Sequence, residues 1–394
     1  VPDVKRELDG WAKALNEDGR EVVVSCGHFP ADADKNMFFD YFLSKLSRPV
    51  VVTGVYPSVM MARVSELHGR HQVQTVDWDI SDVEIPLEMI EQYPRVGKKL
   101  RASIRATHGC PRKCGMCPAW LIYRKSFRVW PIENTVSRIR KYYDEGVRFI
   151  TFIDDNLTVS PKFDVLLEQL AEANLKGMEY ICQEGFEVTS FHRDRMCQLL
   201  KRVKFVDMKM AVENVNRDVL VQIDKYYKDF SVVEQALKNI QRYELEVGSY
   251  FLFGLEKTEE EVLNNIRFIA ENALDVRVNV VRPYEGGVVK EGEVNEHMFR
   301  SFSSLAYAAS WYARTLGVNI MSPDALDQLK AAGYNVVESA GKLKVVGKTD
   351  HYRMTSRFVR GLKWMGGQWL GRECQVLVRE DVVTITGKPK GFGL

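Results

Sequence analysis

Between about residue 98 and residue 290, short apolar runs alternate with amphipathic stretches, and this alternation limits the fold more than any other feature. Ser160, Ser231 and Thr258 are the predicted N-caps of helices in this region. Six strand–helix steps predict an α/β fold whose parallel sheet curves into a partial (β/α)6 TIM-like barrel. In such a barrel the active site forms where the strands end. The predicted strands are LRASIRAT, VRFITFIDD, MEYICQEGF, FVDMKMAVE, VGSYFLFGL and VRVNVVRPY.

Two further regions flank the predicted barrel. Residues 1–95 contain the runs EVVVSCG and PVVVTGVYP on either side of a helical stretch, which predicts buried parallel strands in a small Rossmann-like α/β domain. Residues 291–394 begin with a helical stretch and continue with short β-like runs, which predicts an α+β extension. The barrel would then occupy residues 96–290.

The composition of the 394 residues is that of an ordinary globular protein, with a formal net charge of +2. No apolar run is long enough to cross a membrane, and the charged N-terminus lacks the apolar core of a signal peptide. We therefore expect a cytoplasmic protein with no membrane partner. In a reducing compartment, the seven cysteines are expected as free thiols or metal ligands rather than as disulfides.

Three of the cysteines, Cys110, Cys114 and Cys117, lie within THGCPRKCGMCPAW, directly after the first predicted barrel strand. A disulfide would leave one of the three thiols unpaired. A structural zinc site needs four ligands, and His108, only two residues before Cys110, is poorly spaced to be the fourth. An iron–sulfur cube held by three thiolates leaves one iron open for a substrate or cofactor. The pattern favours the iron–sulfur cluster, and zinc is the alternative.

The spacing C-x3-C-x2-C of Cys110, Cys114 and Cys117 matches the signature of the radical S-adenosylmethionine (SAM) enzymes, and roughly residues 80–290 resemble that family. The resemblance implies a 4Fe-4S cluster whose open iron binds the amino and carboxylate groups of SAM. One electron would cleave SAM to methionine and a 5′-deoxyadenosyl radical, which removes a hydrogen atom from the substrate. It also implies a low-potential electron donor of the flavodoxin or ferredoxin type.

The same resemblance implies contacts with SAM at several strand ends. Residues after the second strand would bind the methionine ammonium, the end of the fourth strand would hold the ribose hydroxyls, and the ends of strands five and six would surround the adenine. Met116 stands where the family usually has an aromatic residue, which would weaken a contact with adenine. Paired aspartates after a strand also suit a turn or helix cap, and the fourth-strand glutamate also suits the surface. In this order, the implied residues are Asp154, Asp155 and Asn156, then Glu213, then Phe253, Gly254, Val281 and Pro283.

Members of the most similar subfamily often carry a cobalamin-binding domain with a D-x-H-x-x-G motif ahead of the barrel. Residues 1–95 are too short for that whole domain, and His28, in SCGHFPADADKN, lacks both the aspartate and the glycine of the motif. We therefore expect a shortened relative of this domain and no cobalamin. Cys182, Cys197 and Cys374 are scattered, so we expect no second cluster, and this favours isomerisation, epimerisation or carbon–carbon rearrangement.

Four polar residues at predicted strand ends suit an anionic or zwitterionic part of the substrate. They are Gln183, Glu184, Lys209 and Arg282, and the arginine fork in particular donates two parallel hydrogen bonds to a carboxylate or phosphate. An arginine paired with a core carboxylate explains Arg282 equally well.

The end of the chain is basic and aromatic. From residue 342 to residue 394, 11 Lys and Arg against 4 Asp and Glu give a net charge of +7, and Tyr352, Phe358, Trp364 and Trp369 are interleaved. Such a surface neutralises phosphates and stacks on bases, so the leading substrate hypothesis is a base in DNA or RNA, already modified or not. A solvated face with its tryptophans in the core explains the same residues. The alternative functions are a radical SAM methyltransferase or epimerase acting on a small metabolite or peptide, and a zinc- or cluster-stabilised nucleic-acid-binding protein.

Overall fold

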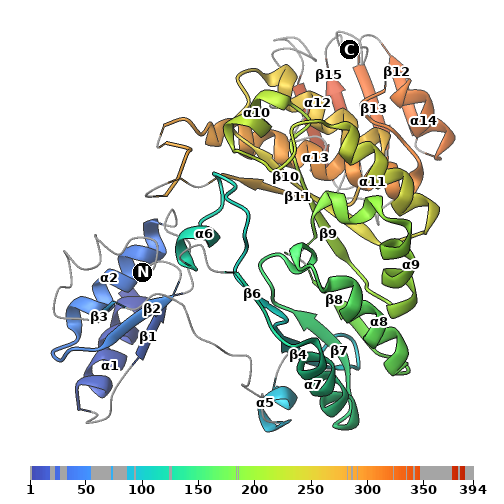
Figure 1. The fold of residues 1–394 in the computed structure, drawn as a ribbon. Helices are drawn as coiled ribbons and strands as arrows, with labels where there is room; N and C mark the ends of the chain where they lie inside the picture. The colour runs from blue at the N-terminus through green and yellow to red at the C-terminus, as the bar shows by residue number, and fades with distance from the viewer. Residues whose placement is uncertain are drawn as a thin grey trace.

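Six parallel strands form a curved sheet in the middle of the chain, and helices cover its outer face (Figure 1). The computed structural model describes residues 2–17, 23–26, 33–54, 72–73, 87–92, 95–123, 127–182, 184, 186–281, 283–284, 287–290, 292–322, 324–333, 335–339, 342–346, 375–379 and 382–386. The six strands are β4 (Leu100–Ile104), β7 (Val147–Phe152), β8 (Glu179–Ile181), β9 (Met208–Glu213), β10 (Val247–Phe253) and β11 (Val276–Val280).

The strands follow one another around a partial barrel. Two three-stranded parallel sheets, β4-β7-β8 and β9-β10-β11, are each joined by regular ladders. The parallel bridges Tyr180–Phe205 and Phe186–Met210 connect the two sheets. This arrangement confirms the predicted α/β class and the partial TIM-like barrel.

Side chains alternate between the two faces of each strand, as the pleat requires. In β4, Ala102 and Ile104 belong to the main core, whereas Arg101, on the other face of the strand, lines a cavity. The helices on the outer face pack on the first set. They are α7 (Ile132–Asp144), α8 (Phe163–Ala173), α9 (Asp194–Val203), α10 (Arg217–Gln222), α11 (Ser231–Arg242), α12 (Glu259–Glu271) and α13 (Glu296–Leu316), with the 3-10 turns η1 (Leu157–Val159) and η2 (Val188–His192).

The three predicted N-caps have different outcomes. Thr258 caps α12, because its side chain accepts a hydrogen bond from the Glu261 backbone N–H. Ser160 accepts from the backbone N–H of Lys162, and α8 begins only after that turn, at Phe163. Ser231 is the first residue of α11 and not its cap. The prediction for Thr258 is confirmed, whereas the caps predicted at Ser160 and Ser231 are wrong by two residues and one residue.

The N-terminal part has a small core of its own. It contains α1 (Pro2–Glu17), β1 (Val23–Cys26), α2 (Ala33–Lys45), β2 (Val51–Gly54) and β3 (Gln72–Val73), and the three strands are parallel in the order β1-β2-β3. Ala12, Phe42, Leu43, Leu46, Val50 and Val52 form that core. Helix α5 (Leu87–Gln92) instead adds Ile90 to the core of the barrel. The parallel α/β arrangement matches the expectation, and the boundary at residue 95 stays a prediction.

The C-terminal part is helical and then antiparallel. After α13 come α14 (Ala325–Ala331) and the strands β12 (Asn335–Ser339), β13 (Lys342–Val346), β14 (Gln375–Arg379) and β15 (Val382–Thr386), in the order β12-β13-β15-β14. The aromatic residues Tyr352, Phe358, Trp364 and Trp369 lie outside the described residues. Within the described part of the chain, no helix combines the length and the apolar character needed to span a membrane.

Candidate active site

The three cysteines of the motif line one cavity of about 340 Å³ at the carboxyl end of the barrel. The chain reaches it through β5 (Thr107–His108), which pairs with β6 (Arg128–Val129), and leaves it through α6 (Ala119–Ile122). Residues after β7, β8 and β9 meet the cysteines there, as expected for strand ends of a parallel barrel. Of the residues singled out from the sequence, Cys110, Cys114, Met116, Cys117, Asp155, Asn156, Glu184 and Glu213 line this cavity.

Two distant segments hold the cysteine loop at Gly115. The Gly115 backbone N–H donates to the Ile223 carbonyl at 2.7 Å, and Tyr284 Oη donates to the carbonyls of Gly115 and Cys117 at 3.1 and 2.9 Å. A Cβ atom at Gly115 would stand 2.1 Å from Val288 Cγ2, so only glycine fits without a shift. The loop is therefore held in place before any cofactor binds.

Burial raises the pKa of the Cys110 and Cys114 thiols, and it raises the pKa of Cys117 to about 12. Backbone N–H groups that donate hydrogen bonds to the three sulfurs lower the pKa of each thiol and so oppose the effect of burial. Among the described residues, no three ligating side chains gather closely enough for one metal ion. A four-iron cube spreads its thiolates over separate corners, so three separated thiols in one cavity fit a cluster better than a single zinc ion.

Asp154 binds the backbone just before the cysteine loop and does not line the cysteine cavity. It is almost fully buried, and its Oδ1 accepts from the Ala106 N–H at 3.0 Å, the Thr107 N–H at 2.5 Å and Thr107 Oγ1 at 2.7 Å. Burial raises the pKa of Asp154 to about 7, against the effect of these three donors. The contact of Asp154 with the cofactor stays a prediction, although its carboxylate already accepts from two backbone N–H groups and the Thr107 hydroxyl.

Asp155 faces the cavity and has one unused oxygen. Its Oδ1 accepts from Tyr123 Oη at 3.3 Å, whereas its Oδ2 is buried without a hydrogen-bond partner among the described residues. Burial raises the pKa of Asp155. A buried carboxylate oxygen without a donor is costly, and a cationic ligand would supply what is missing. SAM carries such cations, so this residue fits the cofactor.

A buried ion pair also lines the cysteine cavity. Glu213 ends β9 with a backbone φ of 68°, and its Oε1 accepts from Lys225 Nζ at 2.7 Å. Both side chains are almost fully buried. Sequence analysis missed Lys225, together with Arg112, Glu187, Tyr226, Tyr250 and Asn279, which also line the cavity. These residues follow no repeating pattern in the sequence, and only Arg112 had a signal, its place inside the cysteine motif.

Four predicted residues that the structure describes do not line the cavity. Phe253 is fully buried, and Gly254, with a φ of 105°, donates its N–H to Glu256 at 2.8 Å. Val281 and Pro283 follow β11 without reaching the cavity. The contact of these four residues with adenine therefore stays a prediction. Gln183 and Arg282 lie outside the described residues.

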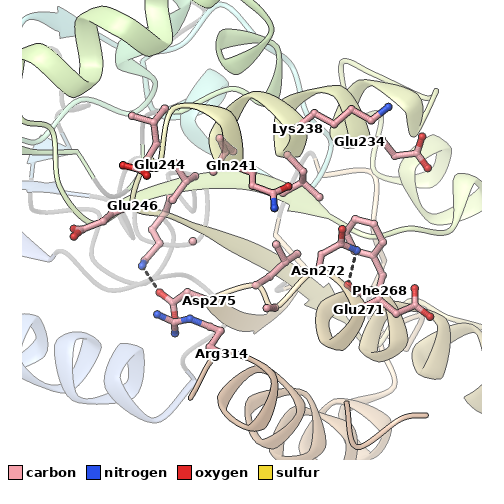
Figure 2. A pocket seen from close by; sticks show the side chains of 18 of the residues that line it. Glu234, Lys238, Gln241, Glu244, Glu246, Phe268, Glu271, Asn272, Asp275 and Arg314 are labelled. Atoms are coloured by element: carbon pink, nitrogen blue, oxygen red, sulfur yellow. Dashed lines mark hydrogen bonds and ion pairs between the residues drawn. The ribbon is translucent and has the colours of Figure 1, made fainter. Parts of the chain in front are cut away.

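Lys209 lies at the wrong end of the barrel for a role beside the cysteines. It is the second residue of β9, it is buried, and it pairs with Asp207 at 2.5 Å and Asp275 at 2.7 Å. It lines a larger cavity of about 1050 Å³ at the amino ends of β9 and β10, where Arg314 also pairs with Asp275 (Figure 2). The prediction that Lys209 stands at a strand end near the substrate is wrong, because it lies near the start of its strand.

A further cavity of about 820 Å³ adjoins the cysteine cavity. The two share Asp155 and Glu184 in their walls. Phe149, Ile153 and Ile181 are among the apolar residues that line the second cavity. A molecule bound there would lie next to a cofactor held by the cysteines.

Comparisons with known proteins agree with this site. Residues 104–269 match the family model of the radical SAM superfamily. The chain is 26% identical over 190 residues to the bacteriochlorophyllide d C-12(1)-methyltransferase of Chlorobaculum tepidum, and 22% identical over 169 residues to the hopanoid C-2 methylase of Rhodopseudomonas palustris. These alignments cover 46% and 42% of this chain, but only 40% and 32% of the two relatives.

The fold also resembles a solved structure. The radical S-adenosylmethionine methyltransferase TsrM from Kitasatospora setae, solved with cobalamin and a [4Fe-4S] cluster, matches with a TM-score of 0.55 and 13% identity. The match covers 71% of this chain and 66% of TsrM. The residues matched by the family model include the cysteine motif, and the structural match shows a shared fold. Residues 104–269 of this chain therefore form a radical SAM domain.

Proposed function

We propose that this chain is a radical SAM methyltransferase whose 4Fe-4S cluster and SAM occupy the cavity around Cys110, Cys114 and Cys117. The observation that carries the proposal is that three thiols line one cavity at the carboxyl end of the barrel together with Asp155, whose buried Oδ2 has no hydrogen-bond partner among the described residues. The names of the curated relatives support methyl transfer over the isomerisation predicted from the sequence. Nothing in the comparisons supports a nucleic-acid base as substrate.

The residues of the cavity have separate proposed roles. Asp155 would bind the ammonium group of SAM through its free Oδ2, and Glu213 would contact the ribose hydroxyls. When bound, the cluster and SAM supply a 5′-deoxyadenosyl radical, given an electron from a low-potential donor. The loop held at Gly115 and the barrel around it position both groups and keep water away.

The adjoining cavity is the proposed place of the methyl acceptor. Its volume of about 820 Å³ is in the range of small-molecule sites, and Phe149, Ile153 and Ile181 suit an apolar body. Tyr250 Oη donates to Glu184 Oε1 at 3.4 Å where the two cavities meet, so polar groups of the acceptor would find partners there. We propose an organic molecule with rings as the acceptor, in line with the pigment and lipid named for the curated relatives.

Cobalamin belongs in the test of this proposal. TsrM was solved with cobalamin, so the expectation of no cobalamin has lost its support. The D-x-H-x-x-G motif occurs nowhere in the sequence, so the residues present do not supply that histidine ligand to cobalt. No step of the proposal passes through cobalamin, and reconstitution with and without it measures the requirement directly.

The experiment uses anaerobically reconstituted protein with SAM and a strong reductant, with and without hydroxocobalamin. Methyl acceptors are a carboxylated tetrapyrrole and a triterpenoid, with DNA and RNA oligonucleotides as alternatives. Mass spectrometry should find both 5′-deoxyadenosine and S-adenosylhomocysteine, because methyl transfer leaves the second product. 5′-Deoxyadenosine without S-adenosylhomocysteine would instead favour the rearrangement chemistry. Neither product, from protein that holds iron and sulfide, would overturn the proposal.

Asp155→Asn is expected to weaken the binding of SAM to the reconstituted protein by about ten- to a hundredfold. The amide keeps the shape of the side chain but loses the charge that would face the ammonium group. Tyr123→Phe is the matched control, since it removes a hydrogen bond to Oδ1 and leaves the charge of Asp155 in place. Equilibrium dialysis with labelled SAM measures both. Equal dissociation constants for wild type and Asp155→Asn would remove Asp155 from the site.

A further inference from the structure

Asn156 connects the end of β7 to the first cysteine of the motif. Its Nδ2 donates to Cys110 Sγ at 3.6 Å and to Glu187 Oε1 at 3.0 Å, and its Oδ1 accepts from Thr158 Oγ1 at 3.3 Å. A thiolate and a carboxylate are both acceptors, so only the NH2 end of the amide can face them. Both ends of the amide are thus used inside the protein, which argues against the predicted contact of Asn156 with the methionine ammonium.

Glu187 holds this amide in place. Its side chain is buried, and Arg112 Nε and Nη2 donate to its two oxygens at 2.7 and 3.0 Å. The Arg112 guanidinium also lies over the Tyr226 ring, 4.9 Å from the ring centroid. The contacts run from Cys110 through Asn156 and Glu187 to Arg112. Both Cys110 and Arg112 belong to the cysteine loop, because Arg112 lies between the first two cysteines of the motif. A bidentate pair of this kind fixes both partners in one geometry.

We propose that Asn156 sets the reduction potential of the cluster through its hydrogen bond to Cys110, with Glu187 and Arg112 as positioning residues for its amide. The inference rests on the proposed function, since it needs the cluster that Cys110 would ligate. One-electron reduction adds negative charge to the cluster and its thiolates, and an N–H donor to a ligand sulfur stabilises that charge. The hydrogen bond therefore raises the potential. The carboxylate of Glu187 lowers it, and Arg112 offsets that effect.

The test is an anaerobic redox titration of the reconstituted chain without SAM. The EPR signal of the reduced cluster is measured at each potential and gives the midpoint. Asn156→Ala removes the donor and should shift the midpoint to more negative values, by about 59 mV if the reduction equilibrium constant falls tenfold. Glu187→Gln removes a negative charge but keeps an acceptor for Asn156, so its midpoint should shift to more positive values. Asn279→Ala is the matched control, since Asn279 lines the same cavity without a hydrogen bond to a cysteine within the described residues.

Opposite shifts in the two variants, with no shift in the control, support the inference, because a general loosening of the site would move both midpoints the same way. If Asn156→Ala retains iron and sulfide and keeps the wild-type midpoint, the inference is overturned even where 5′-deoxyadenosine still forms. If that variant holds no cluster, Glu187→Gln decides, and an unchanged or more negative midpoint overturns the inference. A wild-type chain without any cluster signal overturns the proposed function and this inference together.

Discussion

Replacing Cys114 by alanine is expected to abolish cluster assembly, and with it the formation of 5′-deoxyadenosine from SAM. Cys114 is the middle cysteine of the motif, and within the described part of the chain only Cys110 and Cys117 share its cavity as further thiols. Three thiolates ligate three of the four irons and leave one iron without a protein ligand. Without Cys114, a second iron would lose its ligand, and no other thiol lines the cavity within the described residues. Iron and sulfide content, visible absorption and mass spectrometry of the nucleoside measure the effect.

The matched control is Cys182→Ala. Cys182 follows β8 and is fully buried in the main core, away from the cysteine cavity. A buried cysteine of this kind behaves as a small apolar side chain, so its replacement should leave iron content and nucleoside formation near wild type. If instead Cys114→Ala formed 5′-deoxyadenosine at the wild-type rate, the cysteines of the motif would not be the ligands.

The barrel could be predicted because its strands carry a strong local pattern. Runs such as VRFITF in β7 carry apolar residues on both faces, which is typical of a buried strand in a parallel sheet. Helix starts were less certain, because a serine near a helix start can cap a turn as well as a helix. The Ser160 side chain accepts a hydrogen bond within the turn before α8 and does not cap the helix. The bridges that join β8 to β9 depend on contacts far apart in the sequence and had no local signal.

The site could be predicted only where a residue follows a strand or belongs to the motif. Asp154 and Asp155 are neighbours after β7, but only one of them lines the cysteine cavity, because the Asp154 carboxylate accepts hydrogen bonds from Ala106 and Thr107 instead. Sequence alone could not decide which. Lys209 was predicted at the end of a strand, but β9 begins at Met208, so the lysine lies at the start of the strand. Glu187 and Lys225 lie in connections, where no period marks a functional side chain.

Replacing Lys225 by methionine is expected to lower the free energy of unfolding of the barrel by about 3–5 kcal/mol, since it leaves the buried carboxylate of Glu213 without its partner. Each side chain of the pair is exposed by 6% or less, so water cannot take the place of the lost ammonium. Urea denaturation followed by circular dichroism measures the loss.

The double variant Lys225→Met with Glu213→Gln removes both charges and should recover most of that stability, because an uncharged pair avoids the cost of burying an unpaired ion. Lys330→Met is the control for losing a lysine charge at the surface: Lys330 pairs with Asp327 at 3.0 Å where both are exposed, and its loss should cost about 1 kcal/mol or less. A loss for Lys225→Met no larger than that of the control would mean that water reaches the pair. Recovery in the double variant would instead assign the loss to the charge of Glu213, beside the cysteines, and not to the packing of the lysine stem.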